Sequence, residues 1–284
     1  MRGRTIGHRP ALPKEIFLKI IMDITTRNLF RLLRAGVLGT QEAVEPMSAW
    51  KWGRAYHLAM VHGVEAEAWA GIRQLEGQFF MRLTDRQRKQ WEKSVLNAPK
   101  AAETELPPRV EKKLRRMGED IPQTAYATFN VLRSLVVLSQ SLLTADRWVR
   151  QLLSLGVLLS GDKLRVDREQ LEKWPGQLGM ERMLQLEGVL LTHLLGISEE
   201  RLPFRLTLDE EQRLQMVEEI VATIDATTHQ WQFSQGSNIF VHNSSSSAMY
   251  WQARHSVRYL KYHPTASISS FFTSFVQSLT NIEE

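Results

Sequence analysis

Apolar residues recur at intervals of three and four along most of the chain. One such series occupies Ile16–Ile24 and another occupies Leu29–Val37. Because residues three or four apart share one face of an α-helix, each series predicts a helix with one buried side. The period-two alternation of strands is confined to Phe204–Leu208 and Asn238–His242. The pattern predicts an all-α protein, an orthogonal or bundle-like assembly of about ten helices with little or no β-structure.

Glycines divide the first hundred residues. Gly36 and Gly39 are expected to end the second helix, because glycine readily adopts the left-handed conformation that closes a helix. Gly63 and Gly71 weaken the helical pattern of Trp50–Gln74 without removing it.

Capping residues and prolines place further boundaries. Thr84 and Gln87 have the spacing of a capping box, so a charged helix is expected from Thr84 to about residue 97. Asp167 predicts a second N-terminal cap, and Pro175-Gly176 is expected to interrupt the helix that follows it.

Prolines concentrate between residues 98 and 123, at Pro99, Pro107, Pro108 and Pro122. This stretch is predicted to be a charged linker or surface excursion carrying a short basic helix near Arg109–Met117. It separates an N-terminal helical region at residues 1–97 from a C-terminal helical domain at residues 124–284.

Composition narrows the classes of function. The 284 residues include no cysteine, which excludes disulfides, thiolate metal sites and cysteine nucleophiles and fits a cytoplasmic protein. No run approaches the roughly 18 apolar residues of a membrane span, and no secretory signal is expected. A net charge of +5 permits an anionic partner.

The predicted helix near residues 248–263 gathers aromatic and basic side chains. Its candidate residues for binding an anion or a nucleotide are Arg254, His255, Arg258 and Lys261. Rings can stack on bases while cations neutralise phosphates. In the simpler alternative, Trp251, Tyr259 and Tyr262 anchor this helix to the core and the cations are solvated.

A second basic cluster flanks the proline-rich stretch. Its candidate residues are Arg86, Lys89, Lys93, Lys112, Arg115 and Arg116. They could meet a nucleic acid or an acidic protein, and the alternative is a pair of solvated helix faces that only favour solubility. The tryptophans of the body are most simply packing anchors: Trp50, Trp52, Trp69, Trp91, Trp148 and Trp174.

The sequence contains few residue patterns that could bind a metal or a cofactor. His57 and His62 are five residues apart and do not share a helix face as a metal-binding pair would. No Gly-x-Ser-x-Gly segment is present, although distant residues can still assemble a triad. We expect no metal and no cofactor.

Two groups of short motifs carry a resemblance to a known family. The first comprises Leu32-Leu33-Arg34-Ala35, Trp50 or Trp52, and His62-Gly63-Val64. The second comprises Leu178-Gly179-Met180, Leu202-Pro203-Phe204 and the closing stretch from Trp251 to Pro264. These motifs resemble the helical flanks of uncharacterised nucleotidyltransferase-like proteins.

In that family the flanks surround a catalytic sheet with a Gly-Ser turn and an Asp-x-Asp pair that binds metal. This chain departs from the pattern, because residues 96–123 leave no room for such a sheet. Gly161-Asp162 with Asp167, and Gly236-Ser237, lack the required pair of carboxylates. No catalytic residue is therefore carried over from the resemblance.

Three functional hypotheses follow. The first is a non-catalytic helical accessory protein that binds a partner protein. The second is a degenerate nucleotidyltransferase that still binds nucleotide or phosphate. The third is a helical module that binds nucleic acid through its basic helices.

Overall fold

The computed structural model describes residues 14–96, 104–119, 121–162, 164–232, 258–259 and 261–262. Within these ranges the chain forms helices and no strand, which confirms the all-α prediction. The helices are α1 (Lys14–Ile21), α2 (Ile24–Leu38), α3 (Ala49–His62), α4 (Glu65–Gln74), α5 (Asp85–Leu96), α6 (Pro108–Glu119), α7 (Tyr126–Thr144), α8 (Trp148–Ser160), α9 (Arg168–Leu178), α10 (Glu181–Leu194) and α11 (Glu210–Gln232), with 3-10 turns at Gln123–Ala125 and Glu199–Arg201.

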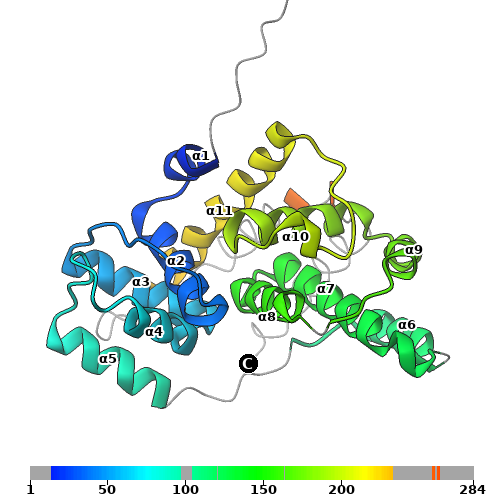
Figure 1. Cartoon of the computed structure of the whole chain (residues 1–284), viewed down its shortest axis with the longest axis horizontal. Coiled ribbons are helices and arrows are strands. Elements are labelled where there is room, and N and C mark those ends of the chain that lie inside the picture. Colours follow the sequence, from blue (N-terminus) through cyan, green and yellow to red (C-terminus); the bar gives the residue numbers. More distant parts are fainter. Residues whose placement is uncertain are drawn as a thin grey trace, which may run out of the picture.

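The helices form one packed assembly (Figure 1). Helices α2 to α5 gather at one end, α6 and α9 lie at the other, and α7 and α8 lie between. Helix α11 contacts α1 and α3 as well as α10. One cluster of buried side chains runs through this assembly, from Met22 in the first part of the chain to Tyr262 in the last. The boundaries predicted near residues 97 and 123 stay predictions.

Left-handed glycines end the second and third helices. Gly39, with a φ of 68°, closes α2, whereas Gly36 lies inside that helix. The prediction that Gly36 can end the helix is wrong. Gly63, with a φ of 64°, closes α3, so residues 50–74 form two helices.

Helices α2 and α4 cross at two glycines. A Cβ atom on Gly71 would lie 1.9 Å from the Leu32 carbonyl oxygen, and one on Gly36 would lie 2.3 Å from that of Glu67. Neither position can hold a side chain, because the two backbones approach too closely. These glycines are contact residues between helices and interrupt neither helix.

The predicted N-terminal caps are present. The Gln87 backbone N–H donates to the Thr84 hydroxyl at 3.3 Å, and the Thr84 N–H donates to the Gln87 side chain at 3.0 Å. The Asp167 carboxylate accepts from the Gln170 N–H at 3.1 Å. The short basic helix predicted in the proline-rich stretch is α6.

Helix α9 continues through Pro175, so the predicted interruption is wrong. Packing explains the difference. Trp174 and Pro175 are buried, and the Trp174 ring meets Phe129 edge-on at 6.1 Å between centroids. The helix ends shortly afterwards at Gly179, and the Pro175 carbonyl accepts from the Met180 N–H at 3.0 Å.

Residues 204–208 form no strand, which corrects a third prediction. The Gln185 side chain of α10 binds this segment by donating to the Arg205 carbonyl and accepting from the Thr207 N–H, both at 2.8 Å. Phe204 and Leu206 pack over Gly188. The alternating apolar residues therefore cover a helix. Asn238–His242 lies outside the described residues.

Five of the six tryptophans predicted to anchor the packing are buried: Trp52, Trp69, Trp91, Trp148 and Trp174. Trp50 is the correction, because 67% of it is exposed. Trp52 lies two positions further along the same helix, and residues two apart point to different sides of a helix. In the described part of the chain, no helix combines the length and apolarity needed to cross a membrane.

Candidate functional site

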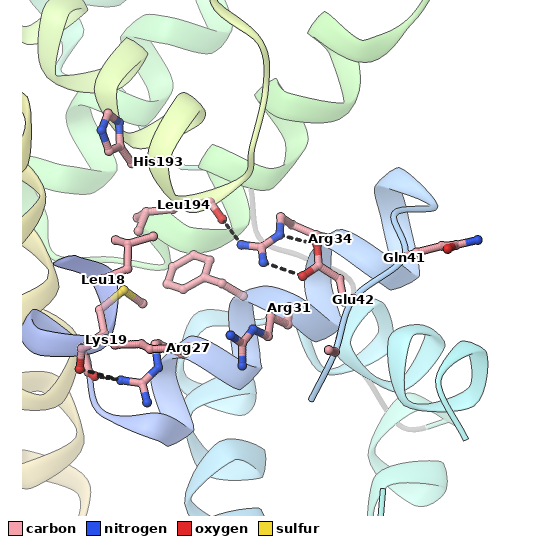
Figure 2. A pocket seen from close by; sticks show the side chains of 12 residues that line it. Leu18, Lys19, Arg27, Arg31, Arg34, Gln41, Glu42, His193 and Leu194 are labelled. Atoms are coloured by element: carbon pink, nitrogen blue, oxygen red, sulfur yellow. Dashed lines mark hydrogen bonds and ion pairs between the residues drawn. The ribbon is translucent and has the colours of Figure 1, made fainter. Parts of the chain in front are cut away.

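A cavity lies between α1, α2, the loop after α2 and the end of α10 (Figure 2). Its volume is about 210 Å³. Three arginines of α2, Arg27, Arg31 and Arg34, line it together with Lys19 and Glu42. The arginines are three or four residues apart, so α2 presents them on one side.

Two of these arginines share one carboxylate. The Arg27 guanidinium forms a two-pronged pair with Glu45, with both N–O distances at 2.9 Å. Arg31 reaches the same carboxylate at 2.7 Å. The Asn28 side chain adds bonds to the backbone of Glu45 at 2.9 and 3.0 Å. Together they fasten the loop to α2.

Arg34 forms a second two-pronged pair with Glu42, at 2.7 and 2.6 Å. Its remaining terminal nitrogen donates to the Leu194 carbonyl at 2.9 Å. This carbonyl belongs to the last residue of α10, where helix carbonyls lack intrahelical partners and carry partial negative charge. Figure 2 shows Arg34 between the two partners.

The pairs with arginine lower the pKa values of the Glu42 and Glu45 carboxylates. The Arg27 hydrogen bond, opposed by partial burial and assisted by the charges of Arg27 and Arg31, lowers the pKa of Glu45 to about 2. Burial works against ionisation of Glu42, but the hydrogen bond and charge of Arg34 outweigh it and lower that pKa as well. Both residues are ionised at neutral pH.

The chemistry of this cavity is therefore structural. The arginine donors are directed at carboxylates and at main-chain carbonyls, and they fix the loop between α2 and α3. His193, at the edge of the cavity, has its Nε2 atom 3.3 Å from Glu210 and its Nδ1 atom 3.1 Å from the Val189 carbonyl. The sequence pattern of arginines on α2 could have indicated a basic face, but not its pairing.

The predicted anion site near the C-terminus is described only in part. Arg254 and His255 lie outside the described residues. The Lys261 ammonium pairs with Glu219 of α11 at 2.6 Å and lies 4.9 Å from the centre of the Tyr262 ring. Arg258 is half-buried.

The tyrosines beside these cations anchor this segment to the core. Tyr259 and Tyr262 are buried, and the Tyr262 hydroxyl donates to Glu219 at 3.1 Å. Burial raises the pKa of both hydroxyls. For these two residues the structure confirms the alternative in which the aromatic rings pack. Whether this segment binds an anion stays a prediction.

The predicted basic residues of α5 share one face. Trp91 is the helix's buried residue, and Arg86, Lys89 and Lys93 lie on the opposite, exposed side at spacings of three and four. We call these three residues the α5 stripe. At 1.5 Å per residue it extends for about 10 Å along the helix.

Helix α6 repeats this arrangement. Leu114 is its buried residue, and Arg109, Lys112 and Arg116 lie on the exposed side at the same spacings as in α5. We call these three residues the α6 stripe. Arg115, also predicted for the basic surface, lies beside the stripe, 3.8 Å from Glu119. The structure thus distributes the predicted cluster over two separate helices.

The burial of two polar side chains was not predicted from the sequence. Glu187 of α10 is fully buried, and the Ser139 hydroxyl of α7 donates to it at 2.6 Å. His62 is fully buried against the edge of Trp148, with 5.7 Å between ring centroids. No three acidic or histidine side chains of the described residues converge on a point that could hold a metal ion.

Comparisons with protein-family models, with curated proteins and with solved structures found no match for this chain. The resemblance to nucleotidyltransferase-like proteins therefore stays a prediction.

Proposed function

We propose that this chain is a non-catalytic helical protein that binds an extended polyanion, specifically a nucleic acid. One observation carries the proposal. Helices α5 and α6 each bury a single residue and turn three cations outward at the same spacing. Exposed acids lie elsewhere on both helices, at Asp85 and Glu92 of α5 and Glu119 of α6, whereas the three positions of each stripe carry one sign of charge.

The dimensions of the stripes suit a phosphate backbone. A nucleic-acid strand carries one charge about every 3.4 Å of helix axis, so a stripe about 10 Å long matches about three phosphates. Figure 1 places α5 and α6 at opposite ends of one edge of the molecule. A long polymer can reach both stripes, whereas a mononucleotide can reach only one.

The other basic groups of the structure support the proposal by contrast. The arginines of the α2 cavity and Lys261 are committed to carboxylates at 2.6–2.9 Å. Arg86 and Lys89 of the α5 stripe, and the whole α6 stripe, form no ion pair with any residue that the structure describes. Their charges remain available to a partner.

The test is the salt dependence of binding to a fluorescent 20-nucleotide RNA, followed by anisotropy. For a single strand, the logarithm of the affinity falls with the logarithm of salt with a slope of about −0.7 per phosphate contacted. Five contacts, from Arg86, Lys89 and the three cations of the α6 stripe, predict a slope of about −3.5. The change Arg86→Gln and Lys89→Gln should remove about 1.4 units of that slope, and the triple change of the α6 stripe should remove about 2 units.

The matched control removes three exposed cations outside the stripes: Arg73→Gln, Arg165→Gln and Arg205→Gln. It changes the net charge equally and should leave the slope close to that of the unaltered protein. RNA affinity that is absent, or that falls equally in the control and in the stripe variants, contradicts the proposal. Binding of a polyglutamate peptide as tight as that of RNA would assign the stripes to an acidic protein and also contradict it.

A further inference from the structure

The guanidinium group of Arg31 is used differently from those of its two neighbours on α2. Arg27 and Arg34 each hold a carboxylate with the edge formed by Nε and Nη2, at 2.6–2.9 Å. Arg31 donates from Nη1, to Glu45 at 2.7 Å and to Asn28 at 3.2 Å. No residue that the structure describes accepts from its Nε or Nη2. The edge that holds a carboxylate in the other two arginines therefore has no protein partner in the described part of the chain.

The three arginines carry more charge than their carboxylate partners balance. Among the described residues, they form ion pairs with two carboxylates, those of Glu42 and Glu45. The arginine side chains are only 13–18% exposed, so water solvates the remaining positive charge poorly. Lys19, which is exposed, also lines the cavity and adds positive charge. A poorly solvated charge without a counter-charge is energetically unfavourable, so this group of arginines favours a bound anion.

The cavity that Arg31 lines has a size and a lining that suit a small organic acid (Figure 2). Its volume of about 210 Å³ corresponds to roughly seven water molecules, because one water occupies about 30 Å³ in the liquid. Three buried apolar residues, Met22, Phe30 and Leu194, belong to its lining. The cavity thus offers apolar surface to a short hydrocarbon chain and a guanidinium group to the charged end of that chain.

A carboxylate matches the unused edge of Arg31. The Nε and Nη2 donors point in parallel and fit the two oxygens of a carboxylate, as they do in the pairs of Arg27 with Glu45 and of Arg34 with Glu42. One carboxylate also carries one negative charge, which equals the arginine charge that the two glutamates leave unbalanced. An inorganic phosphate ion could pair with the same edge, but it would leave the apolar lining uncovered.

We infer that the α2 cavity binds a small monocarboxylate with a short hydrocarbon chain. Its carboxylate pairs with Nε and Nη2 of Arg31, and its chain lies against Met22, Phe30 and Leu194. Glu45 keeps its pairs with the arginines in this arrangement, so the loop after α2 stays fastened and ligand binding adds to the structural role of the cavity. The inference does not depend on the proposed function, because the cavity shares no residue with the α5 and α6 stripes.

The experiment titrates the full chain with sodium hexanoate at constant ionic strength and measures the heat of binding. Two further compounds are titrated in parallel. 1-Hexanol has the same hydrocarbon chain without the charge, and sodium phosphate has the charge without the chain. We expect each of them to bind at least about tenfold more weakly than hexanoate, because a charge-assisted hydrogen-bonded pair and a buried hydrocarbon chain each contribute at least that factor.

Two variants test the position of the ligand. Arg31→Lys keeps the positive charge but removes the paired donors, so hexanoate affinity should fall at least about tenfold. Ala43→Leu leaves every arginine in place and puts a larger side chain into the cavity lining, so it should weaken hexanoate binding as well and decides the result if Arg31→Lys does not fold. The matched control is Arg73→Lys at an exposed position of α4, which should leave the affinity unchanged.

Hexanoate binding that both cavity variants weaken and the control does not is the expected result. Hexanoate that does not bind, or that binds both cavity variants as tightly as the unaltered protein, overturns the inference. Equal affinity for 1-hexanol also overturns it, because the carboxylate would then contribute nothing. Phosphate that binds as tightly as hexanoate would assign the cavity to an inorganic anion and overturn the inference too. The salt dependence of RNA binding tests the stripes separately from all of these outcomes.

Discussion

Glu187 is a carboxylic acid in the protein interior, where its ionised form is energetically unfavourable. The side chain is fully buried, only Ser139 donates to it among the described residues, and one carboxyl oxygen has no partner there. Burial raises the pKa of Glu187 well above its usual value of 4.5, with the Ser139 hydrogen bond opposing the shift. The folded protein therefore keeps this group protonated at pH values where the unfolded chain has lost the proton.

The sign of the resulting pH dependence is opposite to that of a paired carboxylate. Below pH 4.5 both states are protonated and Glu187 contributes no dependence. As the pH rises above 4.5, the unfolded chain releases a proton that the folded chain retains, so stability falls by up to about 1.4 kcal/mol per pH unit. The fall ends at the folded pKa.

Replacing Glu187 with Gln should remove this loss. The amide has the same shape and still accepts from Ser139, but it does not ionise. We expect Glu187→Gln to match the unaltered protein at pH 4 and to exceed it at pH 7 by about 1 kcal/mol or more. Urea unfolding at the two pH values measures the difference. A variant that is less stable at pH 7 would show that Glu187 is ionised in the folded state.

At the scale of helices, the crossing of α2 and α4 depends on two glycines, because a side chain at either position would clash with the other helix. Gly36→Ala and Gly71→Ala each place a methyl group less than 2.5 Å from a carbonyl of the other helix. We expect each to lower the free energy of unfolding by about 1–3 kcal/mol, or more where the backbone must move. Thermal or urea unfolding measures the change.

Gly53 provides the control for this prediction. It lies within α3, and a Cβ atom there would meet nothing within 4 Å. Gly53→Ala should raise stability by about 0.5–1 kcal/mol, because alanine loses less conformational freedom in a helix. Equal effects at all three glycines would show that helix propensity decides them and would contradict the close crossing.

Helix α5 is held mainly by Trp91, its one buried residue, which meets Tyr56 edge-on at 5.0 Å between centroids. Trp91→Ala should therefore release α5 while α2 and α4 keep their packing. Hydrogen exchange should accelerate across α5 and stay slow in α2. Exposed Trp50→Ala is the control and should change neither. Acceleration throughout the chain would show that Trp91 supports the whole core.

The helices could be predicted because their signals are local. Spacings of three and four, the Thr84–Gln87 box and the Asp167 cap act within a few residues, and the structure confirms them. The failures came from partners distant in sequence. Pro175 stays helical because of the packing around Trp174, and residues 204–208 pair with a glutamine side chain about 20 positions earlier.

The candidate sites show the same division. The stripes of α5 and α6 were predictable residue by residue, since helical period alone sorts cations from buried residues. The exposure of Trp50 was not predicted, although Trp50 and Trp52 are two apart and cannot both face one side of a helix. The pairing of the α2 arginines depends on a loop whose course no local pattern specifies.

For the whole molecule, we expect acid to destabilise the fold through groups whose pKa values are lowered in the folded state. The pKa of Glu45 is about 2, so its ion pairs stabilise the fold above pH 4.5 and are lost as the pH falls towards 2. Burial lowers the pKa of His62 to about 4. Below pH 6.5, His62 therefore takes up a proton in the unfolded chain but stays neutral in the folded protein until the pH approaches 4. Both effects reduce stability as the pH falls.

A Glu45→Gln variant separates the first effect from the second. It should be less stable than the unaltered protein at pH 7, and the gap should close as the pH falls from 4.5 towards 2. Melting temperatures recorded across this range provide the measurement. A gap of constant size would mean that the Arg27 and Arg31 pairs with Glu45 contribute nothing that protonation can remove.

The hydrogen bond from Arg34 to the Leu194 carbonyl joins residues 160 positions apart, so it can form only late in synthesis of the chain. At about 5–20 residues per second, a ribosome needs roughly 10–30 s to make the sequence between them. Throughout that interval α2 lacks the end of α10, and for most of it α2 also lacks α8 (Trp148–Ser160), which it contacts. Until then, apolar residues of the nascent N-terminal helices stay exposed. We therefore expect chaperones that bind emerging polypeptides to bind these helices.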